Sequence, residues 1–146
     1  SITNRNSTSL PFGFDYSFEA AAYAKTAGSL LLVRPRVLGI KTSAILETKD
    51  PRLFPVEFDA PVKDTDSFTI TLPAGYVVDE LPPPVDADFG FASYHSRTEA
   101  KGNVIAYTRT YEIKGLSVPV NKLDQLKKFY RIIYNDERST AVAKLP

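Results

Sequence analysis

Residues 55–85, PVEFDAPVKDTDSFTITLPAGYVVDELPPPV, decide the fold class of this chain. In this stretch, short segments of alternating apolar and polar residues are separated by Pro, Gly and acidic residues. Alternation with a period of two is typical of β-strands that bury one face. The clearest example carries Phe68, Ile70 and Leu72 on one face, with threonines between them. The stretch therefore predicts a β-domain and contains no recognisable active-site motif.

Turn signals divide the same stretch into further strands. Residues 72–75, Leu-Pro-Ala-Gly, place Pro second and Gly fourth, as a type I turn prefers. Residues 76–81 then form the next extended segment, and residues 56–59 form a shorter strand upstream. The three prolines at residues 82–84 donate no backbone hydrogen bonds, so they are expected to adopt polyproline II and to end the segment.

The N-terminal third of the chain is less regular. Residues 1–13 are mostly polar and are interpreted as a leader or linker. Apolar residues then alternate over residues 14–25, which predicts a strand that pairs as a hairpin with the apolar segment Leu30–Val33. Residues 34–55 are interrupted by Pro and Gly, and we expect a loop there.

The C-terminal third predicts a hairpin followed by a helix. Residues 89–97 and 104–113 alternate as strands, with a Lys-Gly-Asn turn at residues 101–103. Leu, Phe, Tyr and Ile then recur at three- and four-residue steps, which predicts an amphipathic helix over residues 122–135, capped by Asn121. A closing strand is expected within the last residues, 141–145.

These elements predict a mainly β fold, namely an antiparallel β-sandwich with one C-terminal amphipathic helix packed against an edge or one end. Residues 14–146 are interpreted as one β-sandwich accessory domain, because the chain has 146 residues and no internal repeat. At 16.2 kDa, a compact fold would expose about 7,500 Å². A core of this size needs no disulfide or metal.

Composition excludes several classes of function. Eighteen basic and 17 acidic residues give a net charge of +1, so neither nucleic acid nor an anionic membrane surface is an expected partner. The longest aliphatic run, Leu30–Val33, is far shorter than the roughly 20 residues of a membrane span. The chain has no Cys and so no thiol nucleophile. It also has no Met, so it is expected to be a processed or excised product, and the lack of a signal peptide is uninformative.

The single histidine, His95, has two interpretations. A chain with one histidine has neither a two-histidine metal site nor a paired histidine relay. Since Phe91 and Ser93 fall on the same predicted strand face, an ordinary strand histidine is the favoured interpretation.

Acidic residues suggest two kinds of site, and both have a simpler explanation. Carboxylates at Asp64 and Asp66, and again at Asp86 and Asp88, resemble calcium ligands, yet neither pair continues into a complete calcium-binding loop. Solvated turn residues are the favoured interpretation. Paired carboxylates for glycoside hydrolysis would come from Asp79, Glu80, Asp86 and Asp88, but their separation in space is not fixed by the sequence. No catalytic, cofactor-binding or metal-binding residue is therefore predicted, and the chain is not expected to be an enzyme.

Arg109 is the one candidate binding residue. It falls among Ile105, Tyr107, Tyr111 and Ile113 on the apolar face of its predicted strand. A cation in that position must pair with a carboxylate, stack on a ring or extend to solvent. A structural ion pair or an edge position is the main interpretation, and ligand binding is the alternative.

Two further surface features have more than one interpretation. Aromatic residues make up 12% of the chain and suit either a sugar- or partner-binding platform or core packing, which explains most of them. On the predicted helix, Lys127, Lys128 and Arg131 suggest a partner surface, although a solvated helix face is the favoured interpretation.

Four segments carry a family resemblance. YAKTAGSLLLVRP (23–35), RLFPVEFDAPVKDTDSFTITLPAGYVVDELPPPV (52–85), IAYTRTYEIKG (105–115) and NKLDQLKKFYRIIYND (121–136) resemble the C-terminal domain of bacterial transglutaminase-like proteins. In that family an N-terminal β-domain and a papain-like core precede this domain. The resemblance covers roughly residues 14–145, and its most specific part is the strand, turn and strand of residues 68–82.

The resemblance implies a noncatalytic role. In such proteins the core carries the Cys, His and Asp of the active site, and no such residue maps onto this chain. The implied function is an accessory domain that docks against the core of its own parent chain, or orients substrates for it, in an exported protein that is periplasmic or extracellular. The alternatives are an independent module that binds a glycan or peptide, and a structural spacer. No cofactor is implied.

Overall fold

The computed structural model describes residues 1–15, 17–18, 20–44 and 51–145. The fold is mainly β, its sheets are antiparallel, and one long helix lies near the C terminus, which confirms the fold class expected from the sequence. The described strands and helices are β1 (Ile2–Thr3), β2 (Gly13–Phe14), β3 (Lys25–Ala27), β4 (Leu30–Val33), β5 (Val56–Glu57), β6 (Val62–Thr71), β7 (Val77–Glu80), β8 (Val85–Asp88), β9 (Ala92–Lys101), β10 (Val104–Ile113), β11 (Ser117–Val118), the 3₁₀ helix η2 (Val120–Lys122), α1 (Leu123–Arg138) and β12 (Ala141–Lys144).

The longest strands form one four-stranded sheet, the long sheet, in the order β6-β10-β9-β8. β10 pairs along its whole length with both β6 and β9. The predicted hairpin of β9 and β10 is confirmed, and Gly102 in its turn has φ +60°, a conformation that glycine adopts without a steric penalty. Because β9 and β10 are neighbours in the sequence, their alternating pattern predicted this hairpin well.

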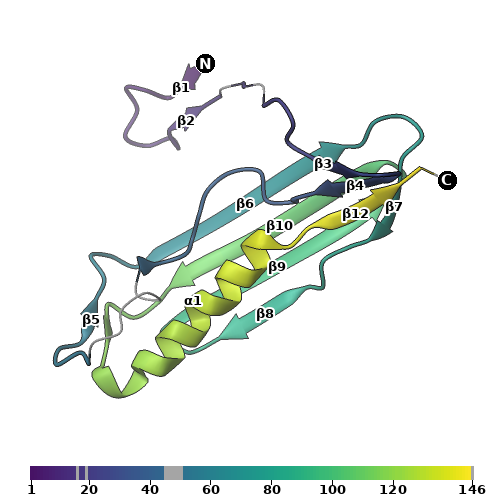
Figure 1. Cartoon of the computed structure of the whole chain (residues 1–146). Helices are drawn as coiled ribbons and strands as arrows, with labels where there is room; N and C mark the ends of the chain where they lie inside the picture. Colours follow the sequence, from purple (N-terminus) through teal and green to yellow (C-terminus); the bar gives the residue numbers. More distant parts are fainter. Residues whose placement is uncertain (16, 19, 45–50, 146) are drawn as a thin grey trace.

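A second four-stranded sheet, in the order β3-β4-β12-β7, lies over one end of the long sheet, and α1 covers the other end (Figure 1). Two buried clusters mark these contacts. Under the second sheet the cluster contains Leu31, Val33, Leu72, Ile105, Ala141 and Ala143. Under the helix it contains Phe91, Ala92, Tyr94, Ile113, Val118, Leu126, Phe129, Tyr130 and Ile133. The helix therefore lies on the face of the long sheet at one end of a sandwich-like arrangement, and not against a sheet edge.

The helix is longer than its sequence pattern predicted. It runs over Leu123–Arg138, beyond the expected end at residue 135, and its N-cap is Lys122, with no side-chain capping bond. The predicted cap, Asn121, lies instead inside the short helix η2, whose 3₁₀ turn leads directly into α1. Among the residues that the structure describes, no helix is long and apolar enough to cross a membrane.

Two local predictions in residues 72–88 were wrong. The amide N–H of Tyr76 donates to the carbonyl of Pro73 at 3.2 Å, so the turn begins one residue later than expected. Gly75 then occupies its third position with φ +90°, as in a type II turn. Residues 85–88 form β8, although their acidic residues suggested a turn, because Asp86 and Asp88 are exposed on an edge strand where carboxylates are tolerated.

The N-terminal segment departs most from the sequence-based expectation. Of the strand predicted over residues 14–25, only Phe14 and Lys25 lie in strands, and residues 16 and 19 lie outside the described chain. Alanine has a low β propensity, and Ala22 adopts φ +55°, which interrupts an extended chain. The predicted hairpin is present as the short pair β3 and β4. β1 and β2 form a small separate sheet away from the sandwich (Figure 1).

The chain exposes more surface than a compact fold of its mass. Its accessible surface is 9828 Å², about a third more than the roughly 7,500 Å² expected from size scaling. The β1–β2 segment and β5 both project from the two large sheets (Figure 1), and β5 pairs with β11 in a short ribbon. The fold therefore presents apolar and charged surface beyond what its core requires.

Candidate functional site

Arg109 lies in the middle of β10 on its buried face. Alternation along the strand places its side chain on the same side as Ile105, Tyr107 and Ile113, all of which are buried. The Arg109 side chain is only 1% exposed. A guanidinium at this depth must be paired to remain charged.

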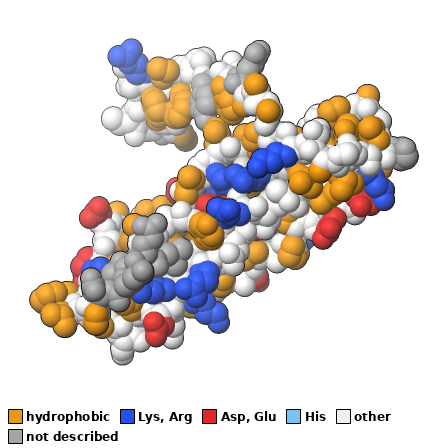
Figure 2. Space-filling view, in the orientation of Figure 1, with side chains coloured by type: hydrophobic (Ala, Val, Ile, Leu, Met, Phe, Trp, Pro, Cys, Tyr) orange, Lys and Arg blue, Asp and Glu red, His pale blue; other side chains and the backbone are white. Residues whose placement is uncertain are grey.

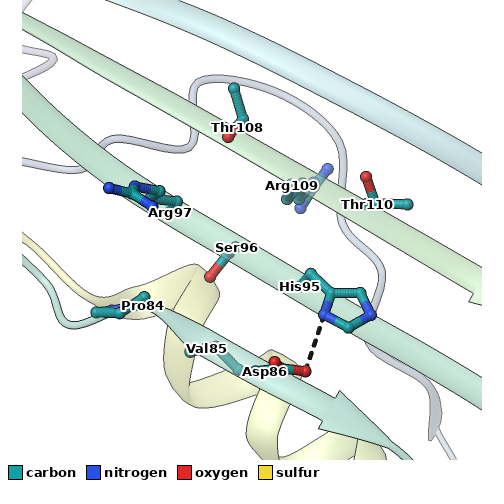
Figure 3. Close-up of a pocket in the computed structure, with 9 residues that line it drawn as sticks. All are labelled: Pro84, Val85, Asp86, His95, Ser96, Arg97, Thr108, Arg109 and Thr110. Atoms are coloured by element: carbon teal, nitrogen blue, oxygen red, sulfur yellow. Dashed lines mark ion pairs between the residues drawn. The ribbon is translucent and has the colours of Figure 1, made fainter.

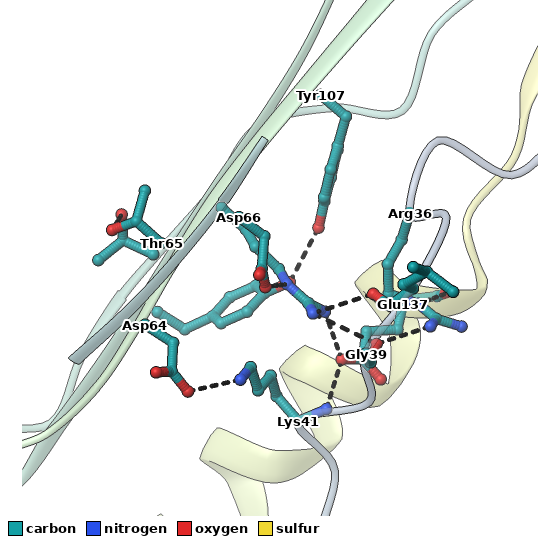
Figure 4. Close-up of polar contacts among 12 residues, drawn as sticks. Arg36, Gly39, Lys41, Asp64, Thr65, Asp66, Tyr107 and Glu137 are labelled. Carbon is teal, nitrogen blue, oxygen red and sulfur yellow. Dashed lines mark hydrogen bonds and ion pairs between the residues drawn. The ribbon is translucent and has the colours of Figure 1, made fainter. Parts of the chain in front are cut away.

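Three separate parts of the chain supply its partners (Figure 4). The Nε of Arg109 donates to the carboxylate of Asp66, its cross-strand neighbour on β6, at 2.7 Å. Its Nη1 donates to Glu137 of α1 at 2.7 Å, and its Nη2 donates to the carbonyls of Leu38 and Gly39 at 3.3 and 3.2 Å. Arg109 thus joins the long sheet, the helix and the loop after β4.

The surroundings of Arg109 are those of a structural ion pair. Burial alone would lower the pKa of Arg109, but the hydrogen bond to Asp66 and the nearby charges of Asp66 and Glu137 raise it overall. Within the described chain, no buried side-chain polar atom lacks a hydrogen-bond partner. The ion pairs with Asp66 and Glu137 agree with the main interpretation from the sequence, a structural ion pair. A ligand-binding role for Arg109 stays a prediction, and a ligand there would have to displace these internal partners.

The close approach of the loop to Arg109 depends on a glycine. Gly39 has φ +73°, and a Cβ at this position would lie 2.9 Å from the Nη2 of Arg109. Both the backbone conformation and the space therefore favour glycine. Arg36 and Lys41 hold the same loop: Arg36 donates to the Gly39 carbonyl at 2.7 Å, and the Lys41 amide donates to Glu137 at 2.7 Å.

We expect Gly39→Ala to lower the free energy of unfolding by roughly 2–3 kcal/mol, because backbone strain adds to weakened Arg109 hydrogen bonds. Gly28→Ala is the matched control, since Gly28 has φ +62° and a methyl group added there would meet nothing within 4 Å. The control should lower the free energy of unfolding only by the cost of backbone strain, roughly 1–2 kcal/mol. Urea denaturation of both variants measures the difference, and equal losses would contradict the proposed crowding of Arg109.

A second buried polar cluster lies beside the first. The hydroxyls of Tyr94 and Tyr107 both donate to the same carboxylate oxygen of Asp136, at 2.6 and 2.8 Å. Burial, together with the Asp136 carboxylate, raises the pKa of Tyr94, and burial raises the pKa of Tyr107 as well. Both tyrosines therefore stay neutral donors at ordinary pH. The cluster fixes α1 on the long sheet and resembles a structural network more than a reactive centre.

His95 lies on the opposite, solvent-facing side of the long sheet, beside a cavity of about 290 Å³ (Figure 3). Its Nδ1 lies 2.9 Å from the Asp86 carboxylate of β8, and these side chains are 49% and 85% exposed. Phe91, predicted to share its face, is buried in the core instead. In the part of the chain described, no hydroxyl side chain forms a hydrogen bond with His95, so the pair has the character of an exposed strand contact.

The acidic residues singled out from the sequence are distributed over different strands. Asp79 and Glu80 lie on β7 of the second sheet, whereas Asp86 and Asp88 lie on β8 of the long sheet. Several have cationic partners: Lys41 pairs with Asp64, Lys114 with Asp88 and Lys144 with Asp79. The acidic residues that suggested calcium ligands lie in strands, which corrects their placement in turns. Over the described ranges, no group of three or more His, Cys, Asp or Glu could hold a metal ion.

The structure reveals a cationic groove that the sequence did not predict. Two adjoining cavities of about 390 and 200 Å³ share Arg34 and Arg36 in their walls. The groove is defined by Tyr23, Lys25, Arg34, Arg36, Tyr134 and Arg138. Figure 2 shows Lys and Arg side chains gathered in the middle of this face. These residues come from β3 and the segment before it, from the loop after β4 and from the end of α1, so no local sequence motif predicts the groove.

Comparison with known proteins gives one match. Residues 29–143, from just before β4 to β12, match a family described as a domain of unknown function for which a structure has been solved, DUF3858. No curated protein and no solved structure matches the chain. The match covers the long sheet, α1, β4, β7 and most of β12, and it begins after both the small β1–β2 sheet and β3.

Proposed function

The chain belongs to this family of domains of unknown function, DUF3858, and from that premise we propose that it is a noncatalytic accessory domain. In this proposal it docks against a transglutaminase-like core encoded in the same parent chain and limits how substrates approach that core. The parent protein would be exported to the periplasm or the outside of the cell. The resemblance of four sequence segments to the C-terminal domain of transglutaminase-like proteins motivates the choice of partner.

One observation carries the docking role, namely an apolar patch at one end of the molecule. We call it the end patch, and it is formed by Leu53, Phe54, Leu116 and Val120, which are 83%, 75%, 47% and 39% exposed. Apolar side chains crowd this end, near β5, in Figure 2. Contiguous exposed apolar surface is characteristic of protein interaction sites.

The end patch is carried on an anchored support. Leu53 and Phe54 lead into β5, and Leu116 and Val120 flank β11, so the pairing of β5 with β11 brings them to the same end. The Phe58 amide donates to the Leu116 carbonyl at 2.7 Å. Val118, between Leu116 and Val120 in the sequence, is buried in the core. A patch held in this way binds a partner with little ordering cost.

The docking role predicts a specific loss of binding. The chain should bind the separately expressed core in a calorimetric titration, and Leu53→Asp/Phe54→Asp should weaken binding at least about tenfold, because two desolvated apolar contacts are replaced by charges. Unfolding by urea should remain unchanged, since both side chains are exposed. Val77→Asp on β7, 45% exposed and at the opposite end, is the matched control.

Two outcomes would contradict this function. One is a parent gene that encodes no transglutaminase-like core beside this domain. The other is the absence of saturable binding, or binding that the end-patch and control variants weaken equally.

A second candidate function is an independent module for a glycan or peptide. It is favoured by the exposed rings of Tyr23 and Tyr134, which are 39% and 42% exposed beside the cavities of the cationic groove. Saturable binding of a ligand to the isolated chain at those tyrosines would support it, whereas docking through the end patch alone would not.

A further inference from the structure

The cationic groove concentrates positive charge on a chain that is nearly neutral overall. Lys25, Arg34, Arg36 and Arg138 line it, while the whole chain carries a net charge of +1. Among the described residues, no carboxylate lies within ion-pair distance of these four side chains. The acidic side chain that borders the groove, Glu137, already accepts hydrogen bonds from Arg109 and from the Lys41 amide. The groove therefore has an excess of charge that an anionic ligand would neutralise.

Internal contacts hold the walls of the groove in place. The guanidinium of Arg36 donates to the carbonyls of Gly39 and Glu137 at 2.7 and 3.4 Å. Arg138 donates to the Tyr134 hydroxyl at 3.0 Å, and its guanidinium lies 5.1 Å from the centre of that ring. Each arginine has five N–H donors, so both retain donors for a ligand. The planar guanidinium group of an arginine held in one position suits a carboxylate, which accepts two parallel hydrogen bonds from it.

The hydroxyl of Tyr23 contacts the backbone of two arginines that line the groove. It donates to the Arg34 carbonyl at 2.5 Å and lies 3.3 Å from that of Arg36. Burial raises the pKa of Tyr23, and the nearby positive charges of Arg36 and Arg34 oppose that rise. The Tyr23 ring lines the same cavity as Lys25, Arg34 and Arg36, so it offers apolar contact to the ligand as well.

The adjacent sheet edge selects the kind of ligand. β3 is the outermost strand of the second sheet, pairs with β4 on one side, and exposes all three of its residues. Lys25 belongs both to this edge and to the groove. An unpaired strand edge offers backbone donors and acceptors to an extended peptide, which can pair with it as a further strand. A glycan or an isolated phosphate has no peptide backbone and does not form this series of hydrogen bonds.

We propose that the cationic groove binds an extended acidic peptide segment, which lies along β3 and directs its carboxylates to Lys25, Arg34, Arg36 and Arg138. The groove shares no residue with the end patch, so this binding does not rest on the docking role. A partner protein with alternating acidic residues would supply the segment.

The test uses the whole chain and a blocked ten-residue peptide of alternating Glu and Thr. We expect saturable binding in a fluorescence anisotropy titration, weakened when salt rises from about 50 to about 300 mM because the contacts are ionic. Arg34→Glu/Arg138→Glu should reduce affinity at least about 100-fold, since two attractive charges become repulsive. Neither side-chain charge has a carboxylate partner among the described residues, and thermal unfolding will check that the variant remains folded.

Lys128→Glu/Arg131→Glu is the matched control, because it makes the same change of charge on the exposed face of α1. It should change affinity less than about threefold if the effect is local. Equal losses in both double variants would overturn the proposal, as would a failure of the peptide to bind. Binding of polygalacturonate in place of the peptide would also overturn it.

Hydrogen exchange tests the peptide's position directly. The amides of β3 should exchange at least about tenfold more slowly when the peptide is bound, because new backbone hydrogen bonds protect them. Binding with no added protection at Lys25–Ala27 would overturn the extended arrangement along the edge.

Discussion

Replacing Arg109 by methionine is expected to lower the free energy of unfolding by roughly 3–5 kcal/mol, because it leaves the buried carboxylate of Glu137 without its charged partner. The side chains of Arg109 and Glu137 are 1% and 4% exposed, so water does not replace the lost contact. Asp66 is 31% exposed and can be hydrated, so most of the loss arises at Glu137. Urea denaturation, monitored by tyrosine fluorescence, measures the change.

A double-mutant cycle separates the ion pair from packing. Arg109→Met/Glu137→Met should recover a large part of the loss, since removing both charges removes the cost of burying one alone. Arg97→Met is the matched control on the same sheet: Arg97 pairs with Glu99 at 2.7 Å, but the side chains are 71% and 62% exposed. Its effect should stay below about 0.5 kcal/mol. Equal effects of Arg97→Met and Arg109→Met would contradict the structural role of the buried network.

The elements that the sequence predicted well are specified by residues that lie close together in the sequence. β9 and β10 follow each other in the chain and alternate regularly, and α1 has a clear apolar stripe. In each case the residues that specify the element also make its contacts. Local patterns were therefore sufficient.

The start of β6 was missed because its acidic residues do not look like strand residues. Asp64 and Asp66 are half-buried in the strand, where Lys41 and Arg109 neutralise them. One signal did point to them: Arg109 falls on an apolar face, and a buried cation requires a carboxylate. The sequence indicated the need for a partner, but strand register, which pairs Arg109 with Asp66, identified it.

The cationic groove was beyond prediction for a different reason. Lys25 and Arg138 are separated by most of the chain and line adjoining cavities because β12, directly after α1, pairs with β4. No short motif encodes that return of the chain. The end patch is similar, since the pairing of β5 with β11 joins its two halves.

The end patch and the cationic groove are positioned by different strands, so the two surfaces can be tested independently. The end patch depends on the β5–β11 ribbon near the start of α1, whereas the groove depends on β3, β4 and the end of α1. α1 is the element common to both, because its two ends approach the two surfaces. A change that loosens α1 from the long sheet should therefore affect both, while changes within one surface should leave the other intact.

Phe129 of α1 is the residue whose truncation tests that dependence most directly. It is 0% exposed and lies between four other rings, with centroid distances of 5.9 Å to Phe89, 6.4 Å to Phe91, 6.1 Å to Tyr111 and 5.3 Å to Tyr130. Phe129→Ala should lower the free energy of unfolding by roughly 3–5 kcal/mol, because it removes buried apolar surface and leaves a cavity.

Phe54→Ala is the matched control for Phe129→Ala, since it deletes the same atoms from a side chain that is 75% exposed. Its effect on unfolding should stay within about 0.5 kcal/mol, although it removes part of the end patch. Phe129→Leu should lose less than Phe129→Ala and keeps the test informative if the alanine variant does not fold. If Phe129→Ala unfolds at the same urea concentration as Phe54→Ala, the helix does not hold the sandwich together, and the end patch and the groove would not share a common support.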